Sequence, residues 1–366
     1  MDKNVFVEHI TMHKYLKYKQ KYLQLKSLQI GGNKKTYTIC SLDSDTNFFF
    51  VVLRRFLDEH GFSEVPQSKA ETSNKIIDFL FFLDIHTFSK KIYQIQCKLK
   101  NELNHVSLLG NKCTLHKLIN DSNNTKLQSY IPKTCDLMEV KHLEKGHILI
   151  LRPCSPSSFG GKGIVRVTTD EQLQKEKRVY ELNYKYPIIA SEYIRNPLLF
   201  DSRKFHLRTY MLITLIPTFK YHLFKTSEIM TAKKPYIDDY FDDVEIHDTH
   251  CKSTEYSYIF PQDGDKLSVQ TNLDDNIRHV WKQIDYICSQ LSLYIKNSAK
   301  PYEESKFGYH LFGLDIVLDT SYNVFLIECN HHPGFSMCGK MTKKYEIFLN
   351  EFINWIYTLA IEPILY

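Results

Sequence analysis

The apolar positions near the start of the chain form short runs and helical stripes, which together predict a small α/β lobe. Residues 37–40 and 77–83 are almost wholly apolar, the pattern of strands buried on both faces. Residues 48–60 carry apolar side chains at helical spacing and end at Gly61, as an amphipathic helix does. Because the order is strand, helix, strand, we expect these strands to be parallel.

After residue 100 the pattern predicts a second body richer in strands. Its long strand over residues 204–213 alternates in polarity, which places Lys204, His206 and Arg208 on one face. Asp274 precedes a long apolar stripe and is expected to cap that helix. The remaining elements are expected as helices over residues 111–119, 274–296 and 345–360 and as strands over residues 148–152, 163–167, 188–194, 311–318 and 324–329.

Ahead of both bodies stands a basic leader. Tyrosines recur at helical spacing among lysines in residues 15–26, and two glycines follow at residues 31 and 32. We therefore expect a leader helix and linker over residues 1–35, the α/β lobe over residues 36–100, and the larger domain over residues 101–366. Leaders of this composition resemble those of proteins from large DNA viruses.

Composition and charge exclude several classes of function. The chain has 366 residues, 43% of them hydrophobic and 24% charged, as in ordinary globular proteins. The net charge is only +5, and the sequence lacks the dense stripe of basic residues that is typical of a nucleic-acid-binding protein. The longest apolar runs are too short to span a bilayer and no signal peptide opens the chain. We expect a monomer that binds neither nucleic acid nor membrane.

The cysteines predict a reducing environment. There are nine, an odd number, and no Cys-x-x-Cys pair occurs among them. We therefore expect reduced thiols, with neither a disulfide framework nor a structural zinc site. The expected localisation is cytoplasmic, and that of the host cell if the chain is viral.

The strongest chemical signal lies in the last two strands. Asp315 interrupts one apolar strand, and Glu328 and Asn330 end the next with their side chains on the same face. Carboxylates are rarely buried unpaired, so an isolated structural role explains this set poorly. Hard oxygen ligands from neighbouring strands are what Mg²⁺ needs while it also binds phosphate oxygens. The sequence therefore predicts a magnesium site at these three residues.

A second signal is the Ser/Gly-rich loop that follows the strand over residues 148–152. Glycine backbones approach phosphates closely, and nearby cations neutralise their charge. The loop is neither a Walker loop nor a Rossmann fingerprint, and on its own a flexible surface hairpin would explain it better. Together with the predicted magnesium site, this loop favours a nucleotide-binding site that the glycine-rich loop covers. The candidate residues are Arg152, Gly160, Gly161, Lys162 and Gly163.

Four motifs, taken together, resemble the tubulin tyrosine ligase-like family of ATP-grasp enzymes. The family's Lys-Pro…Gly-x-Gly-Ile is similar to residues 152–164. Its Pro-Leu-Leu-Ile-Asp-Gly-Arg-Lys-Phe-Asp-Leu-Arg is similar to residues 197–208 at all but three positions. Its His-Leu-Thr-Asn element resembles residues 247–250, and its Asp…Glu-x-Asn metal site resembles the three predicted ligands. The resemblance covers roughly residues 100–360.

The resemblance implies an α/β ATP-grasp fold in which antiparallel sheets of central and C-terminal lobes hold ATP between them. It also implies ligation: a carboxylate takes the γ-phosphate of ATP, and an amine attacks the acyl-phosphate to give an amide, ADP and phosphate. Implied catalytic residues are Arg208, Arg152 and His247, and implied metal ligands are Asp315, Glu328 and Asn330. Implied nucleotide-binding residues are Lys112, Arg152, Gly160, Gly161, Lys162, Gly163, Ser191, Glu192, Tyr193, Ile194, Lys204, His206 and Thr249.

The chain departs from the family pattern at several positions expected to contact the nucleotide or the substrate. Arg152 stands for the usual lysine, His206 for an aspartate and Ser191 for a glutamine, and each change alters nucleotide contacts. Met230 stands for the arginine that grips an acidic substrate in the family. Lys225 or Lys233 could compensate for it, since the sequence alone does not fix the register of this segment.

Three functions remain open from the sequence. The first is a ligase that uses Mg²⁺ and ATP to add glutamate, glycine or tyrosine to a protein acceptor such as tubulin or another acidic-tailed protein. The second is an ATP-grasp kinase that phosphorylates an alcohol such as an inositol phosphate, for which cations near His331 are sparse. The third is a non-catalytic nucleotide- or cytoskeleton-binding module. The intact metal motif favours the ligase.

Overall fold

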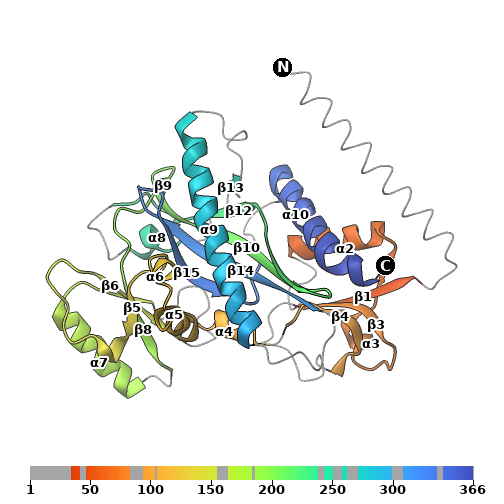
Figure 1. Ribbon diagram of the computed structural model, residues 1–366, viewed down its shortest axis with the longest axis horizontal. Coiled ribbons are helices and arrows are strands. Elements are labelled where there is room, and N and C mark those ends of the chain that lie inside the picture. Colours follow the sequence, from red (N-terminus) through yellow and green to blue (C-terminus); the bar gives the residue numbers. More distant parts are fainter. Residues whose placement is uncertain are drawn as a thin grey trace. The chain divides into compact units, whose positions relative to one another are not determined.

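The computed structural model describes residues 34–41, 47–82, 94–103, 105–154, 164–183, 186–237, 243–249, 258–261, 271–298, 308–335 and 341–365. These residues form two compact units, each considered by itself below (Figure 1). One unit gathers the described residues of Met1–Asn101, Gly334–Ser336 and Glu346–Tyr366, and the other those of Glu102–Pro333 and Met337–Tyr345. The expected leader helix over residues 15–26 lies outside the described residues.

The first unit contains the parallel sheet that the sequence predicted. Its strand order is β2-β1-β3-β4 and every pairing is parallel. The side chain of Asn47 accepts a hydrogen bond from the Phe49 amide at the start of its main helix, and Gly61 follows the helix with a φ of +80°. The elements are β1 (Lys35–Cys40), α2 (Phe48–Glu59), β2 (Phe62–Glu64), α3 (Gln67–Ala70), β3 (Ile77–Phe82) and β4 (Cys97–Lys100).

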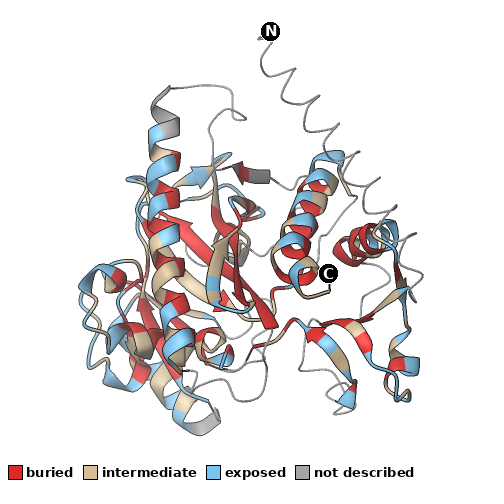
Figure 2. Ribbon diagram, turned by 45° about the vertical axis from the view of Figure 1, so that its right-hand side comes forward, coloured by how far each residue is buried: buried red, intermediate tan, exposed pale blue. Residues whose placement is uncertain are grey.

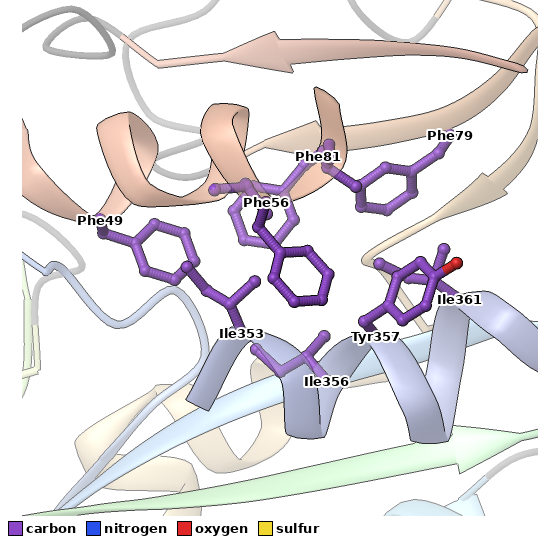
Figure 3. Close-up of a pocket in the computed structure, with 10 residues that line it drawn as sticks. Phe49, Phe56, Phe79, Phe81, Ile353, Ile356, Tyr357 and Ile361 are labelled. Atoms are coloured by element: carbon purple, nitrogen blue, oxygen red, sulfur yellow. The ribbon is translucent and has the colours of Figure 1, made fainter. Parts of the chain in front are cut away.

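Aromatic packing joins this sheet to the end of the chain. Helix α10 (Lys343–Ile356) continues through a π-helical turn, Tyr357–Ile361, into α11 (Glu362–Leu365). The ring of Phe56 on α2 packs edge-on against Tyr357, with centroids 5.3 Å apart. Figure 3 shows these rings around an apolar pocket in which Tyr357 is the one titratable lining residue. The pocket is therefore a feature of core packing.

The second unit is built on a seven-stranded sheet whose pairings are all antiparallel. Its strand order is β13-β12-β10-β14-β15, and β9 and β11 also pair with β10. Strands β10 and β14 run side by side with nine residue pairs in register, from Leu207↔Ile316 to Leu215↔Gly308. The strands are β9 (Leu199–Phe200), β10 (Arg203–Leu215), β11 (Phe219–Leu223), β12 (Thr226–Thr231), β13 (Tyr258–Pro261), β14 (Gly308–Leu318) and β15 (Val324–Asn330).

Helix α9 (Thr271–Ser298) packs its apolar stripe into the core of this unit. Val280, Ile284 and Leu291 on this stripe are fully buried, whereas the opposite face is exposed (Figure 2). The helix begins before Asp274, so the predicted cap at that residue is wrong: the helix extends through the polar residues that precede the stripe. Among the described helices, none combines the length and apolar character that crossing a bilayer requires.

A second, four-stranded antiparallel sheet completes this unit, with strand order β5-β8-β6-β7. Leu151, Val167 and Ala190 from its strands pack with Leu173 of α7 to form a separate small core. The mixed α/β content with antiparallel sheets agrees with the predicted class. The elements are α4 (Ser107–Gly110), α5 (Lys112–Asn120), α6 (Thr125–Gln128), β5 (Thr134–Asp136), a 3₁₀ turn (Leu137–Glu139), β6 (Leu149–Pro153), β7 (Val165–Val167), α7 (Asp170–Asn183), β8 (Ile188–Glu192) and α8 (Val244–His247).

The prediction that all cysteines are reduced is wrong for one pair. Cys113 at the start of α5 and Cys154 after β6 form a disulfide with their Cα atoms 5.5 Å apart. They are 41 residues apart in sequence, so no local spacing signals the pair. The other described cysteines, Cys40, Cys97, Cys135, Cys288 and Cys329, are free thiols.

Reduction of this disulfide should destabilise the protein. Closing a 41-residue separation restricts the unfolded chain by about 4 kcal/mol at 25 °C in the chain-entropy treatment. We expect the free energy of unfolding, measured by urea denaturation, to fall by up to this amount in the presence of dithiothreitol. A Cys113→Ser variant should be insensitive to the reductant, and Cys135→Ser should respond like the wild type. Superimposable curves for the wild-type protein with and without reductant would contradict the pairing.

Candidate active site

Four charged residues lie in register across neighbouring strands of the larger sheet. Glu328 on β15 pairs with Asp315 on β14, Asp315 pairs with Arg208 on β10, and Arg208 pairs with Glu228 on β12. Residues in register across adjacent strands share a face of the sheet. The row therefore presents two carboxylates, one guanidinium and a third carboxylate in that order. We refer to these four residues as the charged row.

The predicted metal ligands meet at one end of the charged row. Asp315 is buried and accepts a bidentate interaction from Arg208, through Nε and through Nη2 at 3.1 Å. The Asn330 amide nitrogen lies 3.3 Å from Asp315 Oδ2 and 3.1 Å from Glu328 Oε1. Gly313 lies two positions before Asp315 on the same face of β14. A Cβ at Gly313 would come within 2.7 Å of Pro333 Cβ and 3.1 Å of Arg208 Cδ. A larger residue there would force Pro333 to shift and would crowd Arg208.

The donor set suits magnesium with additional ligands from phosphate. Two carboxylates and an amide supply hard oxygen atoms, and Mg²⁺ usually completes its shell with phosphate and water oxygens. Within the described part of the chain no three His, Cys, Asp or Glu side chains cluster as a metal site on their own. The carboxylates are instead balanced by cations, Arg208 at Asp315 and Lys112 at Glu328. The donor set thus fits a magnesium ion whose remaining ligands come from a bound anion.

Helix α5 brings a cation and a histidine to this end of the site. Lys112, its first residue, places Nζ 2.8 Å from Glu328 Oε2. His116, one turn later on the same helix face, accepts a hydrogen bond at Nε2 from Arg152 Nη2 at 3.1 Å. Burial, with the positive charge of Arg152, lowers the pKa of His116 to about 3, so the ring is neutral and able to accept. His116 was not among the residues predicted from the sequence, although its spacing of four residues from Lys112 in a predicted helix places both on one helix face.

Arg152 is buried and its guanidinium is held by protein groups. Nη1 donates to the Ile327 carbonyl at 2.7 Å, and Nη2 donates to Ser191 Oγ at 2.9 Å. Burial lowers the pKa of Arg152 to about 10, against the opposing influence of Glu328, so it remains a cation at neutral pH. Arg152 therefore ties β6 of the smaller sheet to β15 of the larger one.

A second cluster surrounds Tyr193, just after β8. Lys204 Nζ lies 3.4 Å from the Tyr193 hydroxyl and 4.5 Å from the centre of its ring. The same hydroxyl is 3.5 Å from His247 Nδ1 and 3.4 Å from the hydroxyl of Tyr236. Tyr236 was not among the predicted residues, because nothing in its local sequence distinguishes it from the chain's other tyrosines.

His206 lies between the charged row and Thr249. Its Nδ1 is 2.6 Å from Thr249 Oγ1, and its Nε2 is 3.7 Å from Asp315 Oδ1. The predicted common face of Lys204, His206 and Arg208 is supported by these contacts, since all three reach predicted site residues. Ser191 and Glu192 end β8, and Ile194 follows Tyr193 at the same margin. The predicted residues Gly160, Gly161, Lys162 and Gly163 lie outside the described part of the chain.

The affinity of this site for a phosphate-bearing anion should fall with rising pH because of Lys204. Burial, together with the charge of Arg166, lowers the pKa of Lys204 to about 8. The side chain is a cation below this value and becomes neutral as the pH rises through it. We expect the affinity for Mg-ADP, measured by calorimetry, to drop roughly tenfold between pH 7 and pH 9. The drop has this size because deprotonation of Lys204 removes one charge-assisted hydrogen bond to the ligand. Lys204→Arg should remove the drop, and a flat wild-type profile would contradict the assignment.

These groups make a sheet face suited to an anionic ligand that is bound together with a metal. The family model described as "Tubulin-tyrosine ligase family" matches residues 96–354, which is most of the chain. The chain belongs to the tubulin-tyrosine ligase family.

Curated relatives are similar at modest identity. "Probable alpha-tubulin polyglutamylase Ttll1" of Tetrahymena thermophila is 27% identical over 254 residues, which are 63% of this chain and 60% of the relative. "Tubulin polyglutamylase TTLL7" of Homo sapiens is 23% identical over 363 residues, 87% of this chain and 38% of the relative. "Protein polyglycylase TTLL10" of Macaca fascicularis is 26% identical over 242 residues, 57% of this chain and 38% of the relative. The chain thus spans less than two thirds of the length of each of these relatives.

Proposed function

We propose that this chain is a Mg²⁺- and ATP-dependent ligase that joins an amino acid to a carboxylate of a protein acceptor. The observation that carries the proposal is the arrangement of Asp315, Glu328 and Asn330 beside the bidentate Arg208. This is a set of oxygen ligands next to a cation that can neutralise a transferring phosphoryl group. Family membership and relatives named as polyglutamylases and a polyglycylase support ligation as the reaction.

In this proposal ATP lies between the two antiparallel sheets of the second unit, as in an ATP-grasp enzyme. Magnesium, when bound at Asp315, Glu328 and Asn330, neutralises phosphate charge. Lys204 and the residues after β8 bind the nucleotide at the opposite margin, where Tyr193 already contacts Lys204. Lys112 and Arg152 add positive charge, and Arg152 does so while its own donors hold the two sheets together.

Arg208 has the central role in the proposed chemistry. The acceptor carboxylate attacks the γ-phosphorus of ATP, which gives an acyl-phosphate and ADP. Negative charge develops on the transferring oxygens, and a guanidinium fixed by Asp315 meets it without reorganising. His247 and Thr249 lie near the acceptor side, where His206 bonds to Thr249. No nucleophilic side chain is needed, because the reaction depends on positioning and on charge neutralisation.

The proposed substrates are a free amino acid and a protein with acidic side chains in an accessible tail, of which tubulin is the first candidate. Relatives named for tubulin polyglutamylation and for protein polyglycylation support a glutamate or glycine donor, and tyrosine is the third choice. We propose that the enzyme acts as a monomer in the cytoplasm.

Amino-acid-dependent ADP release tests this function. Purified protein would be incubated with ATP, Mg²⁺ and tubulin or an acidic peptide, with each common amino acid in turn. Release of ADP and phosphate that requires both an amino acid and an acceptor supports the ligase. Transfer of labelled phosphate to an alcohol such as an inositol phosphate would establish the kinase instead. ATP binding with neither product would leave only a non-catalytic module.

A further inference from the structure

Glu228 occupies the far end of the charged row, and the proposed metal and phosphate chemistry gives it no role. It pairs in register with Arg208, on the side of Arg208 opposite to Asp315. Adjacent strands are about 5 Å apart, which places the Glu228 backbone about 10 Å from that of Asp315 across the sheet. A phosphoryl group bound over Asp315 and Arg208 on this face would thus have Glu228 on its outer side, beyond Arg208.

The Glu228 carboxylate is held in place by two phenols. The Tyr210 hydroxyl donates to Oε1, and the Tyr345 hydroxyl donates to Oε2 at 3.3 Å. Both tyrosines are fully buried, whereas Glu228 is half-buried, so part of this side chain remains accessible. A carboxylate has about four acceptor sites, and the phenols use two. The others can accept hydrogen bonds from a ligand.

The charges around Glu228 come from three elements. Arg208 and Tyr210 face it from β10, Tyr345 from α10 and Asp315 from β14. Burial raises the pKa of Glu228 above its ordinary value, although Tyr210, Arg208 and Tyr345 act in the opposite direction. Arg208 donates two hydrogen bonds to Asp315 and none to Glu228. The matching ligand is therefore a cation with several N–H donors.

We propose that Glu228 receives the ammonium group of the incoming amino acid and takes its proton. This rests on the proposed ligase function and identifies the residue that selects an amine as the second substrate. The ammonium gives one proton to the carboxylate, and the neutral nitrogen attacks the carbonyl carbon of the acyl-phosphate. A C–N bond forms, the C–O bond to phosphate breaks with its electron pair on phosphate, and the second N–H proton leaves with that phosphate. Glu228 then releases its proton to solvent.

The position of Glu228 suits this step for a geometric reason. The amine must reach the carbon that bears the transferred phosphate. With that phosphate over Asp315 and Arg208, an amine bound at Glu228 would approach it from beyond Arg208 as seen from the metal ligands. A base with a raised pKa is better matched to proton transfer near neutral pH than an ordinary carboxylate. Glu228 meets both requirements, whereas Asp315 is engaged with Arg208.

Hydroxylamine separates this role from formation of the acyl-phosphate. Hydroxylamine is largely neutral at pH 7 and traps acyl-phosphates as hydroxamates without prior loss of an ammonium proton. For Glu228→Gln we expect hydroxamate formation within about threefold of wild type and a rate of amino-acid ligation lower by about 100-fold, the usual size of a general-base effect. Glu228→Asp keeps a carboxylate and should retain more ligation than Glu228→Gln. The exposed Glu181→Gln on α7 should match wild type in both assays.

Equal activity of Glu228→Gln and wild type with amino acids would overturn the role of Glu228. Parallel loss of hydroxamate and ligation in both Glu228 variants, with unchanged melting temperatures, would also overturn it, because Glu228 would then act through Arg208. Absence of both products from the wild-type protein would instead count against the ligase function itself. The affinity for Mg-ADP should be the same in all four proteins.

Discussion

Replacing Glu328 with Gln should reduce amino-acid-dependent ADP release by at least about 100-fold, since a catalytic metal supplies several kcal/mol of charge stabilisation. The substitution removes a proposed metal ligand and also leaves Lys112, which lies 2.8 Å from Glu328, without its carboxylate. A cation near a site meant for Mg²⁺ then repels the metal. The apparent Mg²⁺ affinity, read from the magnesium dependence of the rate, should weaken together with turnover.

Glu181→Gln on the exposed face of α7 is the matched control for Glu328→Gln. It makes the same chemical change in the same unit, away from the sheet face, and should leave both parameters unchanged. Wild-type turnover by Glu328→Gln at ordinary magnesium concentration would show that this carboxylate binds no catalytic metal.

The second large effect is expected for Arg208→Lys, which should lower turnover by about 100-fold to 1,000-fold. Lysine keeps the positive charge but lacks the planar fork that holds Asp315 with two hydrogen bonds. Asp315 would then no longer be held in one orientation. The transferring phosphoryl group would also lose the guanidinium that donates to it from a fixed position. Since Arg208 acts mainly in the transition state, the affinity for Mg-ADP should change by no more than a few-fold.

The corresponding control is Arg178→Lys at an exposed position of α7. Circular dichroism and the melting temperature should confirm that both variants are folded. If Arg208→Lys lost nucleotide affinity and turnover in equal measure, Arg208 would be a ground-state binding residue, and its proposed transition-state role would be wrong.

Local patterns were sufficient to predict the core elements of both units. The apolar run before Cys40 became β1, and the alternation that grouped His206 with Arg208 became one face of β10. The predicted ligands converge because Asp315 and Glu328 stand in register on paired strands, and strand pairing preserves the side-chain alternation that sequence shows. A site built on paired strands can therefore be predicted largely from the alternation of side chains along each strand and from the chemistry of the residues.

Contacts between segments remote in sequence could not be predicted in this way. The disulfide at Cys113 depends on where α5 meets the end of β6, and the bonds of Arg152 depend on how β6 meets β15. Glu228 reads as an ordinary polar position of β12 until Tyr345, 117 residues later, is placed against it. Each of these pairings is set by tertiary packing, which leaves no periodic trace in the sequence.

Ligation through an acyl-phosphate is tested most directly by following an oxygen atom from the acceptor carboxylate into the released phosphate. An acidic acceptor peptide with ¹⁸O-labelled carboxylates would be incubated with the protein, ATP, Mg²⁺ and an amino acid, and the released phosphate analysed by mass spectrometry. Ligation through an acyl-phosphate moves one ¹⁸O from the acceptor into phosphate for every amide formed. Phosphate that carries no ¹⁸O while amide accumulates, or ADP formed with no free phosphate, would contradict the account.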